Sequence, residues 1–454
     1  MNTPILFTAA RISVILLAAE CGLRADTPGG AAKASENAPP AGSPSVETPA
    51  LSDSPTLKEY VEYALAHNPG VEAAKMRYLA AAQTPAQEKA LDDPQIVYKY
   101  SLQSDTERQS LSIEQMFPWP GTLGLRRKMA EAMAQAELKR FNGLRLGTAF
   151  RVKESYYEYY YLGRAVAVAG ENLDLMKSFH QAALARYRTS SVQYADVVRA
   201  EVELGKMENE LRMLEEMRPS AAAKLNTAIG RPAQEDRPFP AGIDEGVPAA
   251  SDGELFDALA KANPEIAAME AEISAAERQV DVSRKNYRPS IMVGLEWKDM
   301  KPEMMDDDFM VMAGISLPIW RGKYRAAESE ARFRLRAAQA ERADRFNMLS
   351  ADLAMAQFRL RDATRRMGLY RDTLIPVAKE ALKAANTAYS AGNAMFLDLI
   401  DSQRSLVEFQ LQYERAVADR AIAAAEIEML TGGSAPSREK AGAPSAAAER
   451  EGSK

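Results

Sequence analysis

The sequence predicts a mainly α-helical protein with a transmembrane β-barrel, built from two tandem copies of one helix-strand-strand-helix-helix unit. Three observations lead to this prediction. Two pairs of short segments alternate apolar with polar or small residues over roughly nine or ten positions each, the length that a tilted strand needs to cross a bilayer. Long alanine-rich stretches of helical character surround these pairs. Landmark residues in the second half repeat those of the first at a constant spacing, which indicates a duplication.

The strand segments show the alternation most clearly. The four predicted strands are residues about 94–103, 109–117, 290–298 and 308–317. In the third of them, Ile291, Val293 and Leu295 fall on one face and small or polar residues on the other. Each pair leads into a turn with proline and tryptophan, Phe117-Pro-Trp-Pro-Gly121 or Leu317-Pro-Ile-Trp-Arg-Gly322. One face of each strand can therefore contact lipid while the other contacts water.

The helical segments complete each unit. Residues 122–187 contain no proline, and at 1.5 Å per residue they predict a helix about 100 Å long. Asn68-Pro69 and Asn263-Pro264 predict a break or kink in the first helical segment of each half, and Pro376 is expected to bend or split the second long helix. The predicted organisation is a signal peptide over 1–25, a flexible tether over 26–54, a first repeat over 55–230, a connector over 231–252, a second repeat over 253–432 and an unfolded tail over 433–454.

The N-terminus indicates export. Arg11 precedes an apolar run over residues 12–19 that is too short to span a bilayer and is typical of a secretory signal. Cys21 is the only cysteine and is a candidate for lipidation, but Glu20 does not suit a lipoprotein signal, and the alternative is that Cys21 leaves with the signal peptide. A single cysteine excludes a disulfide within the chain.

Barrel closure requires more than one chain. Four strands cannot close a barrel, and open sheet edges are not tolerated in lipid. Twelve strands from three chains would leave a water-filled interior. The alternative is a soluble α+β protein with two half-buried hairpins. Aromatic residues near the strand ends, such as Tyr98, Trp297 and Phe309, favour the membrane because aromatic side chains prefer its interfaces.

The sequence predicts no enzyme activity, no cofactor, no resident metal and no nucleic-acid partner. His67 and His180 fall in different helices, and no glycine-rich phosphate loop is present. Methionines cluster in and beside the second strand pair at positions 300, 304, 305, 310 and 312. Thioether sulfur suits copper(I) or silver, but methionines are scattered through the whole chain and a packing role is favoured.

The duplicated order, the Asn-Pro after the first helix and the exit from the strands at residues 117–121 resemble the TolC family of outer-membrane efflux channels. The resemblance covers about residues 55–432. Its most specific part is the segment from Tyr389 to Asp401, which is similar to the family's tip, whereas the first tip has Ser190 in place of the glycine. The resemblance implies a homotrimer with a barrel in the bacterial outer membrane and a helical tunnel through the periplasm. It also implies a periplasmic adaptor and an inner-membrane pump of the RND type as partners. The residues at 117–121 further resemble the family's heavy-metal branch.

Two groups of residues at the tips are candidate sites. Asp398 and Asp401 share one helix face, so a trimer would present up to six carboxylates around a narrowing that could favour cations or hold a gate. The alternative is ordinary acidic residues at a helix N-terminus. The resemblance implies adaptor contacts at Thr189, Ser190, Ser191, Asp196, Gly392, Asn393 and Ala394. By composition alone these are turns between helices.

Together these features predict a passive exit duct for substrates that an inner-membrane pump delivers through the adaptor. Two alternatives remain: a soluble periplasmic coiled-coil scaffold or adaptor without a pore, and a type I protein-secretion duct. The sequence does not distinguish a metal ion, a drug or a polypeptide as cargo.

Overall fold

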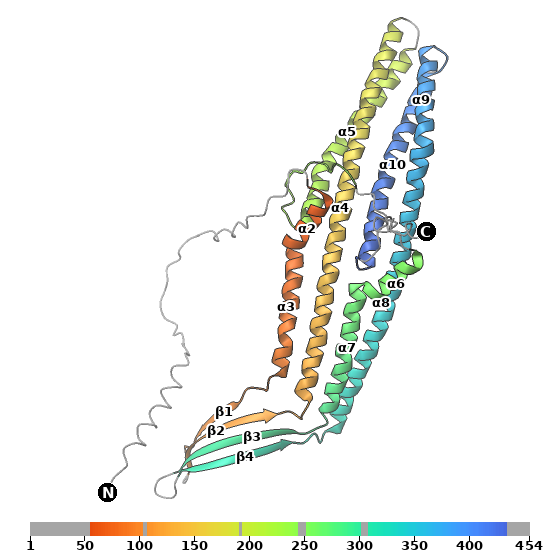
Figure 1. The fold of residues 1–454 in the computed structure, drawn as a ribbon. Coiled ribbons are helices and arrows are strands. Elements are labelled where there is room, and N and C mark those ends of the chain that lie inside the picture. The colour runs from red at the N-terminus through yellow and green to blue at the C-terminus, as the bar shows by residue number, and fades with distance from the viewer. Residues whose placement is uncertain (1–54, 103–106, 190–192, 244–250, 301–306, 434–454) are drawn as a thin grey trace, which may run out of the picture. The chain divides into compact units, whose positions relative to one another are not determined.

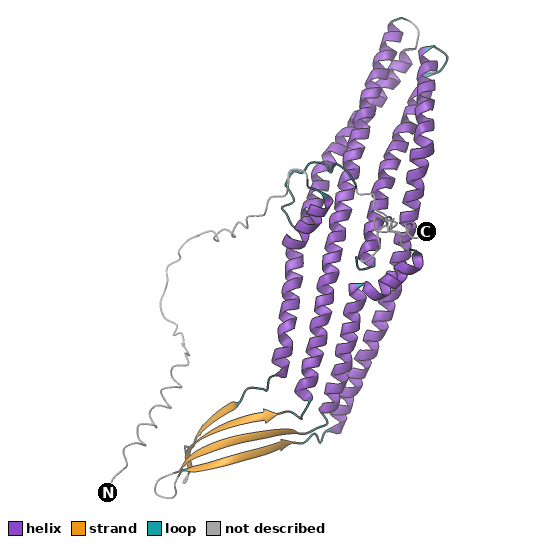
Figure 2. Cartoon of the chain, viewed as in Figure 1, coloured by secondary structure: helices purple, strands orange, loops and turns teal. Residues whose placement is uncertain are grey.

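The computed structural model describes residues 55–102, 107–189, 193–243, 251–300 and 307–433, all within the compact unit that begins at Leu51. In this unit a four-stranded antiparallel sheet lies at one end of a set of long helices (Figures 1 and 2). The predicted mainly α-helical fold with a four-stranded antiparallel element is confirmed. The predicted signal peptide, Cys21, the tether and nearly all of the tail lie outside the described residues.

Both halves of the chain contain the same order of elements. The first half consists of α2 (Leu57–His67), α3 (Pro69–Lys89), β1 (Gln95–Tyr100), β2 (Glu107–Phe117), α4 (Thr122–Arg188) and α5 (Tyr194–Ile229). The second half consists of α6 (Asp252–Ala262), α7 (Pro264–Lys285), β3 (Ser290–Met300), β4 (Asp308–Ser316), α8 (Arg321–Leu369), the π-helix η1 (Tyr370–Leu374), α9 (Ile375–Ser390) and α10 (Phe396–Leu430). The α4 helix has 67 residues, close to the length expected from its freedom from proline.

The expected interruption at Pro376 takes the form of the π-helix. Pro376 lies in the first turn of α9, where its missing N–H removes no hydrogen bond of that helix. The five residues of η1 immediately precede it and join α8 to α9. The second long helix is therefore divided at this point without a loop.

A junction of the same design occurs once in each half. Asn68 separates α2 from α3, caps α3 and donates its side-chain amide to the carbonyl oxygen of Ala228 at 3.1 Å. Asn263 separates α6 from α7 and donates to the carbonyl oxygen of Leu430 at 2.9 Å. Gly432 follows α10 with φ 71°, and a Cβ there would lie 2.3 Å from a backbone oxygen of α6. The Asn-Pro motif thus ties the start of each repeat to its end.

The sheet has the order β1-β2-β3-β4, with β1 and β4 at its edges. Its register aligns the apolar positions of neighbouring strands: Ile113 pairs with Leu295, and Leu295 pairs with Val311. This apolar face is open in the single chain, with Val311 77% exposed. The opposite face is polar and covered, with Ser112 only 2% exposed and Glu296 also buried. The alternation in sequence therefore becomes one continuous apolar face across four strands.

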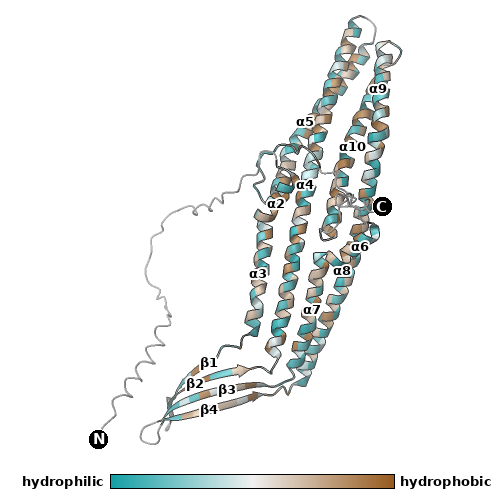
Figure 3. Cartoon of the chain, in the orientation of Figure 1, coloured by the Kyte–Doolittle hydropathy of each residue, from teal (hydrophilic) through white to brown (hydrophobic). Residues whose placement is uncertain are grey.

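The helices pack through several apolar clusters, and their surfaces mix hydrophobic with hydrophilic residues along their length (Figure 3). Tyr156, Tyr157 and Tyr159 of α4 lie in one of these clusters. Tyr159 donates to the carbonyl oxygen of Arg237 at 2.6 Å, and Tyr156 donates to that of Gly242 at 3.0 Å. Among the described helices, none combines the length and the hydropathy that a membrane crossing requires.

Candidate functional site

The two helical hairpins of the chain meet at the end opposite to the sheet, where the candidate gate and adaptor residues lie (Figure 1). An apolar cluster joins α4 and α5 of the first hairpin to α9 and α10 of the second. It contains Met176, Phe179, Ala183, Val197, Ala200, Tyr389, Phe396, Leu399 and Ile400. The rings of Tyr389 and Phe396 lie 5.3 Å apart, and Phe396 is fully buried. The two tips of one chain are therefore held together by a small hydrophobic core.

Arg186 connects the end of α4 to the end of α9. Its guanidinium donates to the carbonyl oxygen of Tyr389 and lies 4.8 Å from the centre of the Tyr389 ring, so one side chain makes both a hydrogen bond and a cation–π contact. Burial raises the pKa of Tyr389, and nearby Asp196 raises it further while Arg186 opposes the shift. The Tyr389 hydroxyl is buried without a hydrogen-bond partner among the described residues. Tyr389 is consequently neutral at physiological pH and acts as a packing residue.

An ion-pair network connects the hairpins just beyond this core. Arg404 on α10 donates its Nε to Glu203 on α5 at 3.2 Å, and Lys206 donates to the same carboxylate at 2.9 Å. Burial alone would raise the pKa of Glu203, but the hydrogen bonds from Arg404 and Lys206 outweigh it and hold the pKa below its ordinary value. Asp401 extends the network, with Oδ1 3.6 Å from Nη1 of Arg404. The network is thus a charged link between the two repeats.

The structure gives the two candidate gate aspartates different local partners. The Asp398 carboxylate accepts the backbone N–H of Met395 at 3.1 Å and so caps the first turn of α10. Asp401 pairs with Arg404 on its own helix. Both carboxylates are on exposed residues. The alternative of an ordinary acidic residue at a helix N-terminus therefore describes Asp398 in the single chain, and a ring of carboxylates in a trimer stays a prediction for both aspartates.

The candidate adaptor residues form the turns at the two tips. Thr189 ends α4 and donates its hydroxyl to a carbonyl oxygen of the preceding turn at 2.9 Å, and Asp196 lies in the first turn of α5. Gly392 has φ 81° between α9 and α10, the backbone N–H of Asn393 donates to a carbonyl oxygen of α9 at 2.9 Å, and Ala394 is half-buried. Ser190 and Ser191 lie outside the described residues. The described candidate residues lie on adjacent hairpins, at the end of the helical part opposite to the sheet (Figure 1).

The methionines near the second strand pair lie mostly on the polar face of the sheet. That face contains Met116, Met292, Met310 and Met312. The Met292 side chain covers Gly314, where an added Cβ would lie 2.9 Å from its Cε, and the Met312 side chain similarly covers Gly294. The positions 304 and 305 lie outside the described residues. These contacts fit the packing role favoured by the sequence.

Sequence reasoning missed three residues at the tips: Arg186, Glu203 and Arg404. Each occurs in a long helix rich in charge, where its type and spacing resemble those of many surface residues. Their partners lie on helices about two hundred positions away in the chain, as the 201 residues between Glu203 and Arg404 illustrate. Only the packing of the hairpins reveals these contacts.

The comparisons with known proteins agree with this geometry. Residues 255–433 match the family described as outer membrane efflux protein. The chain is 24% identical to the cobalt-zinc-cadmium resistance protein CzcC of Cupriavidus metallidurans, over 83% of this chain and 90% of that protein. It is 25% identical to the pyoverdine export outer membrane protein OpmQ of Pseudomonas putida, over 84% and 86% of the two chains. The solved outer-membrane channel OprN superposes with a TM-score of 0.73 at 18% identity, covering 84% of this chain and 91% of that one.

A four-stranded sheet with an open apolar face, joined to long helical hairpins, defines an outer-membrane channel. The chain matches the outer membrane efflux protein family over residues 255–433 and shares the fold of the TolC-like outer-membrane channels. It is accordingly an efflux channel of the bacterial outer membrane, a transport protein and not an enzyme. Channels of this family form trimers with efflux partners.

Proposed function

We propose that three copies of this chain form one duct, with twelve strands closing a barrel and the helical hairpins forming a periplasmic tunnel. The edge strands β1 and β4 each have one partner strand within the chain, and pairing β4 of one copy with β1 of the next would satisfy both edges. Closure turns the apolar face to lipid and the polar face to the interior, which matches the exposed Val311 and the buried Ser112. This division of faces is the observation that carries the proposal.

The duct is passive and its cargo is set by the pump that feeds it. The relatives' names point to different cargoes, cobalt, zinc and cadmium for one and pyoverdine for another. Among the described residues, no cluster of three or more histidine, cysteine or acidic side chains is arranged to hold a metal ion. We therefore propose delivery by an inner-membrane pump of the RND type through a periplasmic adaptor, with no cargo chemistry at the duct wall. Export of the chain by a signal peptide over residues 1–25 is part of the same proposal.

The tips are the proposed gate and adaptor contact. Asp398 and Asp401 are exposed at the end of the second hairpin, and three copies would bring their carboxylates around the tunnel axis. Repulsion between the carboxylates would then favour opening, whereas the Glu203–Arg404 link and the apolar core keep the hairpins of one chain closed. An adaptor that separates the turns at Gly392 and Thr189 would shift this balance.

Planar-bilayer conductance tests the duct and the gate together. The informative variant is Asp398→Asn with Asp401→Asn, because asparagine removes the charge and its side-chain oxygen can still accept the backbone N–H of Met395. Asp257→Asn, at an exposed acid of α6, is the control for the loss of a surface charge away from the tips. We expect small cation-selective steps in the wild type and in the control, with larger steps or weaker block by divalent cations in the double variant.

Three outcomes separate the parts of the proposal. Identical traces from all three proteins would remove both aspartates from the gate and leave the duct intact. Absence of steps, with monomeric protein in the soluble fraction, would overturn the duct and favour a soluble scaffold. Release of an unfolded polypeptide through the duct in a reconstituted secretion assay would favour the type I secretion alternative.

A further inference from the structure

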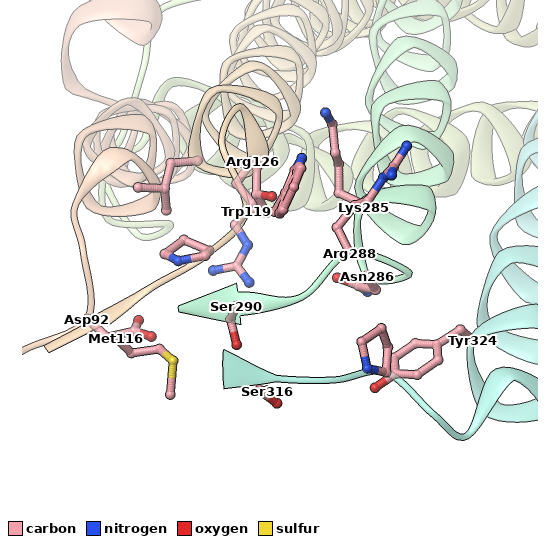
Figure 4. Close-up of a pocket in the computed structure, with 14 residues that line it drawn as sticks. Asp92, Met116, Trp119, Arg126, Lys285, Asn286, Arg288, Ser290, Ser316 and Tyr324 are labelled. Atoms are coloured by element: carbon pink, nitrogen blue, oxygen red, sulfur yellow. The ribbon is translucent and has the colours of Figure 1, made fainter. Parts of the chain in front are cut away.

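A cavity of about 270 Å³ lies where the sheet meets the helices (Figure 4). It is lined by residues at the ends of β2, β3 and β4, the last turn of α7 and the first turns of α4 and α8, and it is partly open to solvent. The cavity is smaller than the roughly 300–1,000 Å³ typical of sites for drug-sized ligands, but it is several times the roughly 30 Å³ that one water molecule occupies. It therefore suits a small chemical group and not a whole drug-sized cargo.

Three cationic side chains line this cavity: Arg126 from α4, Lys285 from the end of α7, and Arg288 from the turn that follows. In the described part of the chain, none of the three has a carboxylate within ion-pair distance. Their neighbour Arg284 shows the usual situation, since it pairs with Asp281 at 3.3 Å and with a second carboxylate.

The remaining charges at the cavity leave an excess of positive charge. Arg288 lies 5.7 Å from the centre of the Trp119 ring, which orients its guanidinium without neutralising it. Asp92 is the one carboxylate among the described lining residues, so the cavity has three cations against one anion.

The helix ends at the cavity add to this positive potential. The first turns of α4 and α8 contain no acidic residue, and neither helix has a side-chain cap at its N-terminus. By contrast, α2, α3, α6 and α7 all have both a side-chain cap and an acidic residue there. The uncapped N–H groups and the helix dipole favour an anion at the starts of α4 and α8.

The cavity opens on the polar face of the sheet. Ser290 and Ser316 are direct cross-strand partners on that face, and Met116 lies on the same side of β2. Figure 4 shows Ser290 and Ser316 at the strand ends beside the helix starts. In the proposed trimer this face lines the interior, so the cavity would occur three times around the boundary between barrel and tunnel. This placement rests on the proposed function, whereas the cavity and its charges do not.

We propose that this cavity binds a phosphate group. Two guanidinium groups, one ammonium group and two serine hydroxyls line the cavity, and these are donor types that form charge-assisted and neutral hydrogen bonds with a phosphate. The group has two sources, free phosphate in the duct or the headgroup of a phospholipid at the membrane boundary. The position of Ser290 and Ser316 on the interior face favours the free anion.

Titration calorimetry with inorganic phosphate tests the site on the purified full-length protein in detergent and chloride buffer. The variant combines Arg126→Gln, Lys285→Gln and Arg288→Gln. The control combines Lys58→Gln, Lys261→Gln and Arg334→Gln, which remove the same charge from surface positions that are 74–84% exposed. We expect phosphate to bind the wild type and the control equally and the cavity variant at least tenfold more weakly. Circular dichroism checks that the helix content of each variant is unchanged. If the triple variant fails to fold, Arg126→Lys is measured in its place; it keeps the charge and is expected to retain phosphate binding.

A second measurement distinguishes the two sources. Phosphorus analysis after solvent extraction reports phospholipid retained by each purified protein. Lipid retained by the wild type and lost from the cavity variant would assign the phosphate to a headgroup, while calorimetric binding without retained lipid would assign it to the free anion. Equal phosphate binding by the wild type and the cavity variant, or no binding of either ligand to the wild type, overturns the inference. Light scattering on the same samples reports trimer formation, so failure of the site is separable from failure of the duct.

Discussion

Replacing Glu203 by glutamine is expected to loosen the contact between the two hairpin tips. The change keeps the size of the side chain but removes the charge that Arg404 and Lys206 contact. A hydrogen bond to a charged group contributes about 1.5–3 kcal/mol. The Glu203 side chain is 10% exposed but that of Arg404 is 48% exposed, so solvent screening places the loss near the lower value. A loss of about 1.5 kcal/mol corresponds to a roughly tenfold larger population of the separated tips.

Native-state hydrogen exchange measures this change directly. Amides in the tip segments of α5 and α10 are expected to exchange about tenfold faster in Glu203→Gln, while amides near the sheet keep their wild-type rates. The control is Glu330→Gln, because Glu330 pairs with Arg334 across one turn of α8 and both side chains are exposed. Such a pair contributes only about 0.3–0.5 kcal/mol. Equal tip exchange in the wild type and in Glu203→Gln would refute the reasoning that this network links the hairpins.

Three further predictions concern the tip link, the repeat junction and the sheet. Because the pKa of folded Glu203 is lowered, its contribution is complete above the ordinary carboxyl pKa of about 4.3 and is lost as pH falls through the folded value. The protection of the tip amides, corrected for the intrinsic exchange rate at each pH, should therefore fall on acidification in the wild type but not in Glu203→Gln. Gly432→Ala is expected to lower the free energy of unfolding by about 2–3 kcal/mol, because the backbone there is left-handed and the added Cβ would clash with a backbone oxygen of α6. Gly205→Ala, in an open stretch of α5, should instead raise that free energy by about 0.5–1 kcal/mol. Denaturant titrations measure both changes. Val311→Arg places a charge on the apolar face of the sheet at a cost of about 2–4 kcal/mol and should deplete the protein from the outer-membrane fraction. The neighbouring Met310→Arg, on the polar face, should not deplete it. Equal depletion by both variants would contradict the assignment of faces.

Much of the fold could be predicted because it depends on local patterns. Alternation such as that of Ile291, Val293 and Leu295 specifies a strand with one apolar face, since side chains in a strand point to opposite sides in turn. The backbone requirements of Asn68-Pro69 and Pro376 likewise placed the helix interruptions. The form of the second interruption, a π-helix from Tyr370 to Leu374, was not predictable because a π-turn has no comparable local signal.

The site at the tips was predicted only in part. The motif around Asp398 and Asp401 located the second tip, but not the partners of these residues. The link from Arg404 to Glu203 joins helices of different repeats, so no spacing in the sequence encodes it. The same holds for the cavity, which brings Arg126 together with Lys285 across more than one hundred and fifty positions.

By itself, the sequence determined the duplicated order of elements and the two faces of the strands, because periodicity and short motifs report backbone conformation and local burial. The tertiary structure alone decided which charges meet. It made Asp398 a helix cap, paired Arg404 with Glu203, and left Arg126 and Lys285 without carboxylate partners in the described part of the chain. The physical reason is that an electrostatic contact depends on the distance between side chains from separate helices, and only the packing of those helices fixes that distance.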